Sequence, residues 1–180
     1  MKEIIWHGLG GQGAVAASSV IGTAVGIYEG RYALSLPIFG AQRRGSAVLA
    51  ITRVSESPVR NRAKECDPDY IVIIDESLIS SALAGLKQGK PRQIIVNSKK
   101  SATELGLTNW SSTIIVDAET IASKIPGNPM VNSVLVGVVA AVTGLAKLDS
   151  IKKAIAEVVP SRHVESNIAA VEAGFKAVKR

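Results

Sequence analysis

The sequence is short of the residues on which several kinds of function depend. It has a single cysteine, Cys66, among its 180 residues. It therefore cannot form an internal disulfide, and it cannot by itself hold an iron–sulfur cluster or a cysteine-rich zinc site. Any redox chemistry must use a cofactor that thiolates do not bind, or a cluster carried by another chain.

Aromatic residues and long apolar runs are also scarce. Aromatic residues make up 4% of the chain and hydrophobic residues 47%, so the core must be built from Ala, Val, Ile and Leu. The longest uncharged stretch, 125–146, is interrupted by Pro126, Gly127 and polar residues. A membrane span needs ~20 predominantly apolar residues. The first residues show no apolar run followed by a small-residue cleavage site. We expect a cytoplasmic protein that does not bind a membrane.

Charge is present in excess of one sign. Lys and Arg number 21 against 15 Asp and Glu, which gives a formal net charge of +6. Such an excess suits nucleic acid, a polyanionic cofactor or an acidic partner protein. The basic residues are scattered, and neither an aromatic RNA-binding motif nor a helix-turn-helix pattern accompanies them. We therefore expect no nucleic-acid function.

Short apolar runs alternate with helical stretches along the whole chain. The predicted strands are 3–7, 31–36, 47–54, 70–74, 92–96 and 113–116, and the predicted helices are 14–28, 77–86, 130–146, 151–158 and 162–178. Strands that are apolar on both faces, alternating with helices, are typical of a three-layer α/β domain. The stretch 46–58 has no helix before it, which indicates one antiparallel strand. We predict one domain over residues 1–180 with a mostly parallel, mixed sheet.

The first motif is Gly8-Leu9-Gly10-Gly11-Gln12-Gly13, which fits G-x-G-x-x-G between a strand and a helix. Glycines allow the tight turn, and without side chains a phosphate can approach backbone N–H groups at the helix start. A dinucleotide site also needs an acidic residue at the end of the second strand. That strand instead ends in 35–37, Ser-Leu-Pro. The loop leaves open an NAD(P) site and a turn that only packs helix on sheet.

The second motif is the loop 37–46, which carries Arg43 and Arg44 between Gly40 and Gly45. It follows the second strand at its carboxyl end, where open α/β sheets place ligand loops. Arginine side chains suit phosphate or carboxylate groups. The loop therefore predicts an anionic ligand or an acidic partner surface, with a merely solvated loop as the alternative.

Other chemistry-bearing residues give weaker indications. His7 ends the first strand and is expected to be packed there. Asp75 and Glu76 are adjacent on a strand end, so they should point to opposite faces and share no proton. Cys66 has no neighbouring histidine, which argues against a nucleophile. We expect no catalytic set on this chain alone.

Four segments together resemble a known family. They are GLGGQG at 8–13, PIFGAQRRGSAVLAITRVSESPVR at 37–60, NPMVNSVLVGVVAAVTG at 128–144 and VESNIAAVEAGF at 164–175. In this order they are similar to the gamma subunit of pyruvate/ketoisovalerate:ferredoxin oxidoreductases. The resemblance implies a Rossmann-like α/β/α fold. The doubled arginine favours the pyruvate/ketoisovalerate branch over the oxoglutarate branch, with pyruvate as the first expectation.

The resemblance also implies a function and partners. Such enzymes convert a 2-oxoacid, coenzyme A and oxidised ferredoxin into an acyl-CoA, carbon dioxide and reduced ferredoxin. This chain would be a subunit that is not catalytic on its own and holds no cofactor alone. Its partners would be alpha, beta and delta subunits, which carry thiamine diphosphate, Mg²⁺ and [4Fe–4S] clusters, and ferredoxin would be reached through the complex.

The two loops would then lie beside the channel through which coenzyme A reaches the thiamine adduct. The resemblance implies that they bind coenzyme A phosphates or order the subunit junction. Two rival functions remain at this point: a free-standing NAD(P)-binding oxidoreductase, and an assembly domain of the same complex whose loop binds no ligand. The residues that the resemblance assigns to the site are Gly8, Gly10, Gly11, Gln12, Gly13, Arg43 and Arg44.

Overall fold

The computed structural model describes residues 1–38, 46–63, 67–84, 86, 93–110 and 112–178. The strands are β1 (Lys2–Leu9), β2 (Tyr32–Ile38), β3 (Ala47–Ser55), β4 (Tyr70–Ile73), β5 (Gln93–Asn97) and β6 (Thr113–Val116). The helices are α1 (Ala14–Thr23), α2 (Ile79–Ala84), α3 (Ala118–Ser123), α4 (Val131–Thr143), α5 (Leu148–Val158) and α6 (Val164–Val178). A π-turn over Ala24–Tyr28 continues α1, and a 3₁₀ turn over Glu76–Leu78 precedes α2.

The strands form one mixed sheet in the order β2-β3-β1-β4-β5-β6. β1, β4, β5 and β6 are mutually parallel, whereas β3 runs antiparallel to both β1 and β2. The predicted mixed sheet with one reversed strand is confirmed. Because β3 lies between β1 and β2, the strand that follows α1 is not the neighbour of β1.

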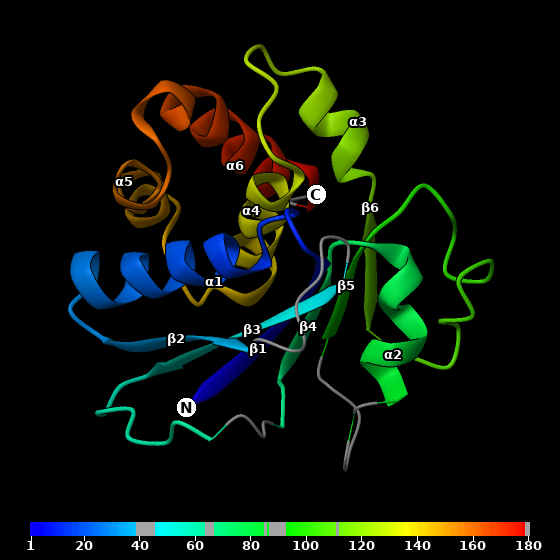
Figure 1. Ribbon diagram of the computed structural model, residues 1–180, viewed down its shortest axis with the longest axis horizontal. Coiled ribbons are helices and arrows are strands. Elements are labelled where there is room, and N and C mark those ends of the chain that lie inside the picture. Colours follow the sequence, from blue (N-terminus) through cyan, green and yellow to red (C-terminus); the bar gives the residue numbers. More distant parts are fainter. Residues whose placement is uncertain (39–45, 64–66, 85, 87–92, 111, 179–180) are drawn as a thin grey trace.

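Helices cover both faces of the sheet, which confirms the predicted α/β/α class. Figure 1 shows α1, α4, α5 and α6 gathered on one face and α2 on the other. Alternation along β1 serves both layers: Ile4 and Trp6 join the core under α1 and α4, while Ile5 packs in the cluster on the α2 side.

A buried chain of hydroxyl groups fastens α1 to the sheet. The indole Nε1 of Trp6 donates to Thr52 Oγ1 at 3.0 Å, and that hydroxyl donates to Ser18 Oγ at 2.8 Å. Ser18 in turn donates to the carbonyl of Ile51 at 3.2 Å. Because each buried polar group has a partner, the helix can lie close to the strands without a desolvation penalty.

Two small residues let α4 and α6 approach closely. A Cβ at Gly137 would overlap the carbonyl oxygen of Val171, and a Cβ at Gly174 would overlap that of Val134. At the start of the same helix pair, Ser133 Oγ donates to Asn167 Oδ1 at 2.7 Å. This contact helps to fix the position of α4, whose first turn bonds the glycine loop through Asn132.

Some predicted boundaries were wrong. Pro37 and Ile38 belong to β2 and not to the loop, because β2 is an edge strand, where a missing N–H costs no ladder bond. The helix predicted over 130–146 ends at Thr143, where Gly144 takes a left-handed φ of 62° and stops it. The short helix α3 was not predicted.

Candidate ligand site at the glycine loop

The predicted loop began at Gly8, but Gly8 and Leu9 pair with β3 as the end of β1, so Gly10 to Gly13 connect β1 to α1 at the carboxyl edge of the sheet. Gly11 has a φ of 96° and Gly13 a φ of 81°, conformations that L side chains rarely adopt. Gly10 and Gly11 are exposed, and a Cβ added at Gly11 would meet no heavy atom within 4 Å. The outer part of the loop is therefore bare main chain facing open space.

The ends of the two predicted loops meet. The N–H of Gly10 donates to the carbonyl of Ser46 at 3.0 Å, where the chain enters β3. The last residue of the second predicted loop thus contacts the first loop. Arg43 and Arg44 lie outside the described residues, so their predicted contribution to the site stays a prediction.

The side chain of Gln12 is hydrogen-bonded to other residues of the chain. Its Oε1 accepts the N–H of Leu9 at 2.7 Å, and its Nε2 donates to Asp75 Oδ2 at 2.8 Å. The backbone N–H of Gln12 closes the turn on the Leu9 carbonyl at 3.0 Å. Among the predicted site residues that the structure describes, only Gln12 carries a side chain beyond glycine, and its carboxamide is bonded within the chain.

Gly13 is required by packing as well as by its backbone angle. Asn132, in the first turn of α4, donates from Nδ2 to the Gly13 carbonyl at 2.9 Å, and a Cβ at Gly13 would overlap that amide. Asn132 is buried, and its Oδ1 has no hydrogen-bond partner among the described residues. Sequence reasoning noted Asn132 only as part of a family motif and missed its contact with the loop.

A cavity of about 410 Å³ opens beside the loop. It is formed by Gly11, Gly13, the first turn of α1 and Val48 of β3. The N–H groups of a first helical turn have no acceptor within their helix, and the helix dipole adds positive potential there. The start of α1 suits a phosphate group, while the side chains that line the cavity are apolar, namely Leu9, Ala14, Val15, Ala16 and Val48.

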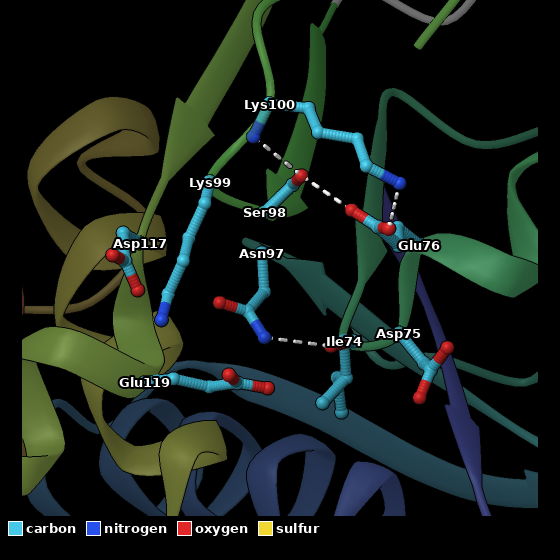
Figure 2. A pocket seen from close by; sticks show the side chains of 9 residues that line it. All are labelled: Ile74, Asp75, Glu76, Asn97, Ser98, Lys99, Lys100, Asp117 and Glu119. Atoms are coloured by element: carbon cyan, nitrogen blue, oxygen red, sulfur yellow. Dashed lines mark hydrogen bonds and ion pairs between the residues drawn. The ribbon is translucent and has the colours of Figure 1, made fainter. Parts of the chain in front are cut away.

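A second pocket, of about 320 Å³, lies at the carboxyl ends of β4, β5 and β6 (Figure 2). Three of its polar residues, Glu76, Ser98 and Lys100, are bonded to one another. Glu76 accepts from Ser98 Oγ and from Lys100 Nζ, each at 2.5 Å. Asn97 donates to the Ile74 carbonyl at 3.0 Å and accepts the N–H of Ala118 at 3.0 Å.

The carboxylates of Asp75 and Glu76 diverge as predicted. Asp75 bonds Gln12 and Ser77, whereas Glu76 bonds Lys100 on the pocket side. Hydrogen bonds from Ser77 and then from Gln12 hold the pKa of Asp75 below its ordinary value. Bonds from Lys100 and Ser98 likewise lower the pKa of Glu76. Both groups are therefore charged at neutral pH and share no proton.

His7 is packed in β1 with 7% of its surface exposed. Burial lowers its pKa from 6.5 to about 4, so the imidazole is neutral at physiological pH. In the part of the chain that the structure describes, no group of three or more His, Cys, Asp or Glu side chains is arranged to hold a metal ion. None of the described helices has the length and apolarity of a bilayer-spanning segment.

A family model described as pyruvate ferredoxin/flavodoxin oxidoreductase matches residues 3–177. The chain belongs to this family. The match covers both the glycine loop and the closing helix α6, and it confirms the predicted resemblance.

Relatives in the pyruvate ferredoxin/flavodoxin oxidoreductase family align along their whole length. The pyruvate/ketoisovalerate oxidoreductases common subunit gamma of Thermococcus kodakarensis is 40% identical over 97% of this chain and 96% of its own. Pyruvate synthase subunit PorC of Methanothermobacter thermautotrophicus is 37% identical over 100% and 97%. The crystal structure of pyruvate oxidoreductase subunit PORC of Thermotoga maritima superposes with a TM-score of 0.79, at 30% identity, over 97% of this chain and 95% of that one. The chain is a gamma subunit of this family and part of a multi-subunit oxidoreductase.

The sheet order argues against the NAD(P) alternative. In a dinucleotide fold the acidic residue that holds the ribose ends the strand beside β1 on the side of α1. Here that neighbour is β3, which is antiparallel and begins at this edge instead of ending there. Val48, at the start of β3, pairs with Gly8. The position that would carry the ribose-binding acid is thus absent from the described sheet.

Proposed function

We propose that this chain is the gamma subunit of a pyruvate:ferredoxin oxidoreductase, with 2-ketoisovalerate as the second candidate substrate. The enzyme would oxidatively decarboxylate the 2-oxoacid with coenzyme A to give an acyl-CoA, carbon dioxide and reduced ferredoxin. The observation that carries this proposal is the alignment of the whole chain with proteins named for pyruvate or for pyruvate and ketoisovalerate.

The proposal includes a division of labour among subunits. Alpha, beta and delta subunits would carry thiamine diphosphate, Mg²⁺ and [4Fe–4S] clusters and would pass electrons to ferredoxin in the cytoplasm. This chain would contribute one domain over residues 1–180. Its single cysteine supports that division, because a [4Fe–4S] cluster requires four cysteine ligands or their equivalents.

Within the complex, the glycine loop would receive the phosphates of coenzyme A. The exposed main chain at Gly10 and Gly11 and the N–H groups of the first turn of α1, which have no acceptor within the helix, fit a polyanionic ligand. Arg43 and Arg44 follow in the loop that ends at Ser46, whose carbonyl holds Gly10. In this role Gly8 and Gly13 shape the turn, while Gly10 and Gly11 leave room for the phosphate.

The subunit assignment is tested by purifying the tagged chain from its native cell. Mass spectrometry of the purified material and a viologen-reduction assay dependent on pyruvate and coenzyme A would be run together. Co-purification of three further subunits with that activity is expected. A chain that emerges alone, inactive and with micromolar affinity for a nicotinamide cofactor would refute the assignment.

The role of the loops is tested separately, by Arg43→Ala/Arg44→Ala in the assembled complex. If the loops bind phosphate, the Michaelis constant for coenzyme A should rise by about tenfold or more, because a bond to a charged group contributes about 1.5–3 kcal/mol. Weakened assembly with an unchanged Michaelis constant would instead favour the alternative in which these loops only order the subunit junction.

A further inference from the structure

We propose that Gln12 and Asp75 form a positioning contact that holds the glycine loop in its ligand-binding shape. This inference rests on the proposed function of the loop. It changes the role of Gln12, which the family resemblance places among the ligand-contacting residues. In the structure both ends of its carboxamide are instead hydrogen-bonded within the chain.

The contact lies where two neighbouring parallel strands are followed by helices on opposite faces of the sheet. From β1 the chain passes to α1 on one face, and from the neighbouring parallel strand β4 it passes to α2 on the other. The loops after these two strands therefore leave the carboxyl edge in opposite directions, the place where open α/β sheets bind ligands. The bond from Gln12 Nε2 to Asp75 Oδ2 connects the two loops.

Both ends of the contact are fixed. Asp75 Oδ1 accepts the N–H of Ser77 at 3.0 Å and its hydroxyl at 2.6 Å, so the carboxylate is held by the turn that begins α2. On the other side, Gln12 Oε1 accepts the N–H of Leu9 and closes the loop on itself. The loop thereby takes its position from the strand β4, 63 residues away in sequence.

A carboxamide is the group that this geometry requires. It must accept from a backbone N–H and donate to a carboxylate at the same time, and Gln does both. Glutamate has the same size but only accepts when ionised, and at position 12 it would face the charge of Asp75. On the far side of the loop, Asn132 holds the carbonyl of Gly13. Hydrogen bonds thus hold Gln12 and Gly13 from two sides, whereas Gly10 and Gly11 stay exposed.

The test uses the assembled oxidoreductase and exchanges the two groups. In Gln12→Glu, the Michaelis constant for coenzyme A should rise about tenfold while kcat changes less than about twofold, because loss of one charge-assisted bond corresponds to roughly a factor of ten. In Gln12→Glu/Asp75→Asn, the amide and the acid have changed places. The net charge equals that of the natural pair, and the Michaelis constant should return to within about threefold of the natural value.

A neutral variant separates positioning from charge. Gln12→Met keeps the length of the side chain and removes both bonds, so its Michaelis constant should also rise, and Asp75→Asn should not rescue it. If Asp75→Asn lowers the Michaelis constant equally in the Gln12→Met and Gln12→Glu variants, removal of the Asp75 charge alone explains the rescue. The inference is then overturned. Size-exclusion chromatography of each complex reports whether the variant chain has assembled.

A third variant distinguishes this inference from the function on which it rests. Gly11→Ala alters the exposed part of the loop and leaves Gln12 and Asp75 untouched. A raised Michaelis constant in Gly11→Ala with a natural one in Gln12→Glu would overturn the positioning role and keep the loop as the coenzyme A site. Natural values in both would refute the proposed function of the loop, and the inference with it.

Discussion

Two stretches of the carboxyl edge of the sheet differ in the groups that they present to a ligand. Around β1, the edge exposes glycine main chain and the first turn of α1, with a cavity of about 410 Å³ in front of them. Across β4, β5 and β6, the edge is lined by charged side chains around a pocket of about 320 Å³, and two of them, Glu76 and Lys100, bond each other. Figure 2 shows how Glu76, Ser98 and Lys100 form one connected group.

The difference teaches where binding capacity lies. A charged side chain that is already paired has little to offer a ligand, since a new contact must first break the old one. Backbone N–H groups that lack an acceptor keep their full capacity. A count of charged residues would select the β4–β6 pocket, whereas main-chain N–H groups without an acceptor in their helix favour the glycine loop.

The largest effect is expected for a substitution at Gly13, and the same substitution at Gly11 is its matched control. Both residues have positive φ, but only Gly13 has Asn132 where a Cβ would stand. We expect Gly13→Ala to lower the free energy of unfolding by about 3–4 kcal/mol, and Gly11→Ala by about 1–2 kcal/mol, which is backbone strain alone. Urea unfolding of the full chain measures both. Equal losses in the two variants would contradict the packing role of Asn132.

The buried imidazole of His7, in β1, should make the free energy of unfolding depend on pH. Its pKa is lowered from 6.5 to about 4 in the folded chain, so the unfolded chain binds more protons between these values. The contribution is complete above pH 6.5 and is lost as pH falls toward 4, up to about 3 kcal/mol in all. Thermal unfolding between pH 4 and 8 tests this. The same slope in His7→Phe would assign the pH dependence to other groups.

The β4–β6 pocket should respond to loss of Asn97. Asn97 is buried and uses both ends of its carboxamide, one on Ile74 and one on Ala118. Asn97→Leu leaves a buried carbonyl and a buried N–H without partners, so we expect a loss of about 2 kcal/mol in unfolding free energy. The Michaelis constant for coenzyme A should not change. A large increase in that constant would move the ligand site into this pocket.

The smallest effect is expected for the exposed pair of Glu76 and Lys100. The pKa of Glu76 is lowered by Lys100 and Ser98, so the contribution of the pair is present above the ordinary glutamate value and disappears as pH falls below it. Glu76→Gln should change the melting temperature little at pH 7, because exposed ion pairs contribute little. If Glu76→Gln alters coenzyme A kinetics as strongly as Gln12→Glu does, the contrast between the two stretches fails.

Much of the fold could be predicted because its signals are local. The run at 70–74 indicated a buried strand, and the glycines at 8–13 indicated a turn between strand and helix. The reversed strand was also expected, from the missing helix before 46–58. Its insertion between β1 and β2 could not be derived, because pairing partners depend on tertiary packing and not on the composition of either strand.

The site was predicted only in part, for the same reason. The glycine loop could be read as a unit since its residues are contiguous. The partners that hold it, Asp75 and Asn132, come from 63 and 119 residues further along the chain, and no periodicity connects them to it. Sequence reasoning considered Asp75 only as one of two adjacent carboxylates, expected them to share no proton, and did not foresee its bond to Gln12. The assigned Arg43 and Arg44 remain predictions.

The close contact of α4 with α6 has a consequence for the order in which the molecule is completed. Asn132 holds the loop at Gly13, and α4, which carries it, is seated on α6 through Gly137 and Gly174. The loop leaves the ribosome before α6, since chains emerge from the amino-terminal end. The shape of the loop is therefore completed only when α6 has been made. A chain that stops before residue 164 should contain the glycine motif without the site.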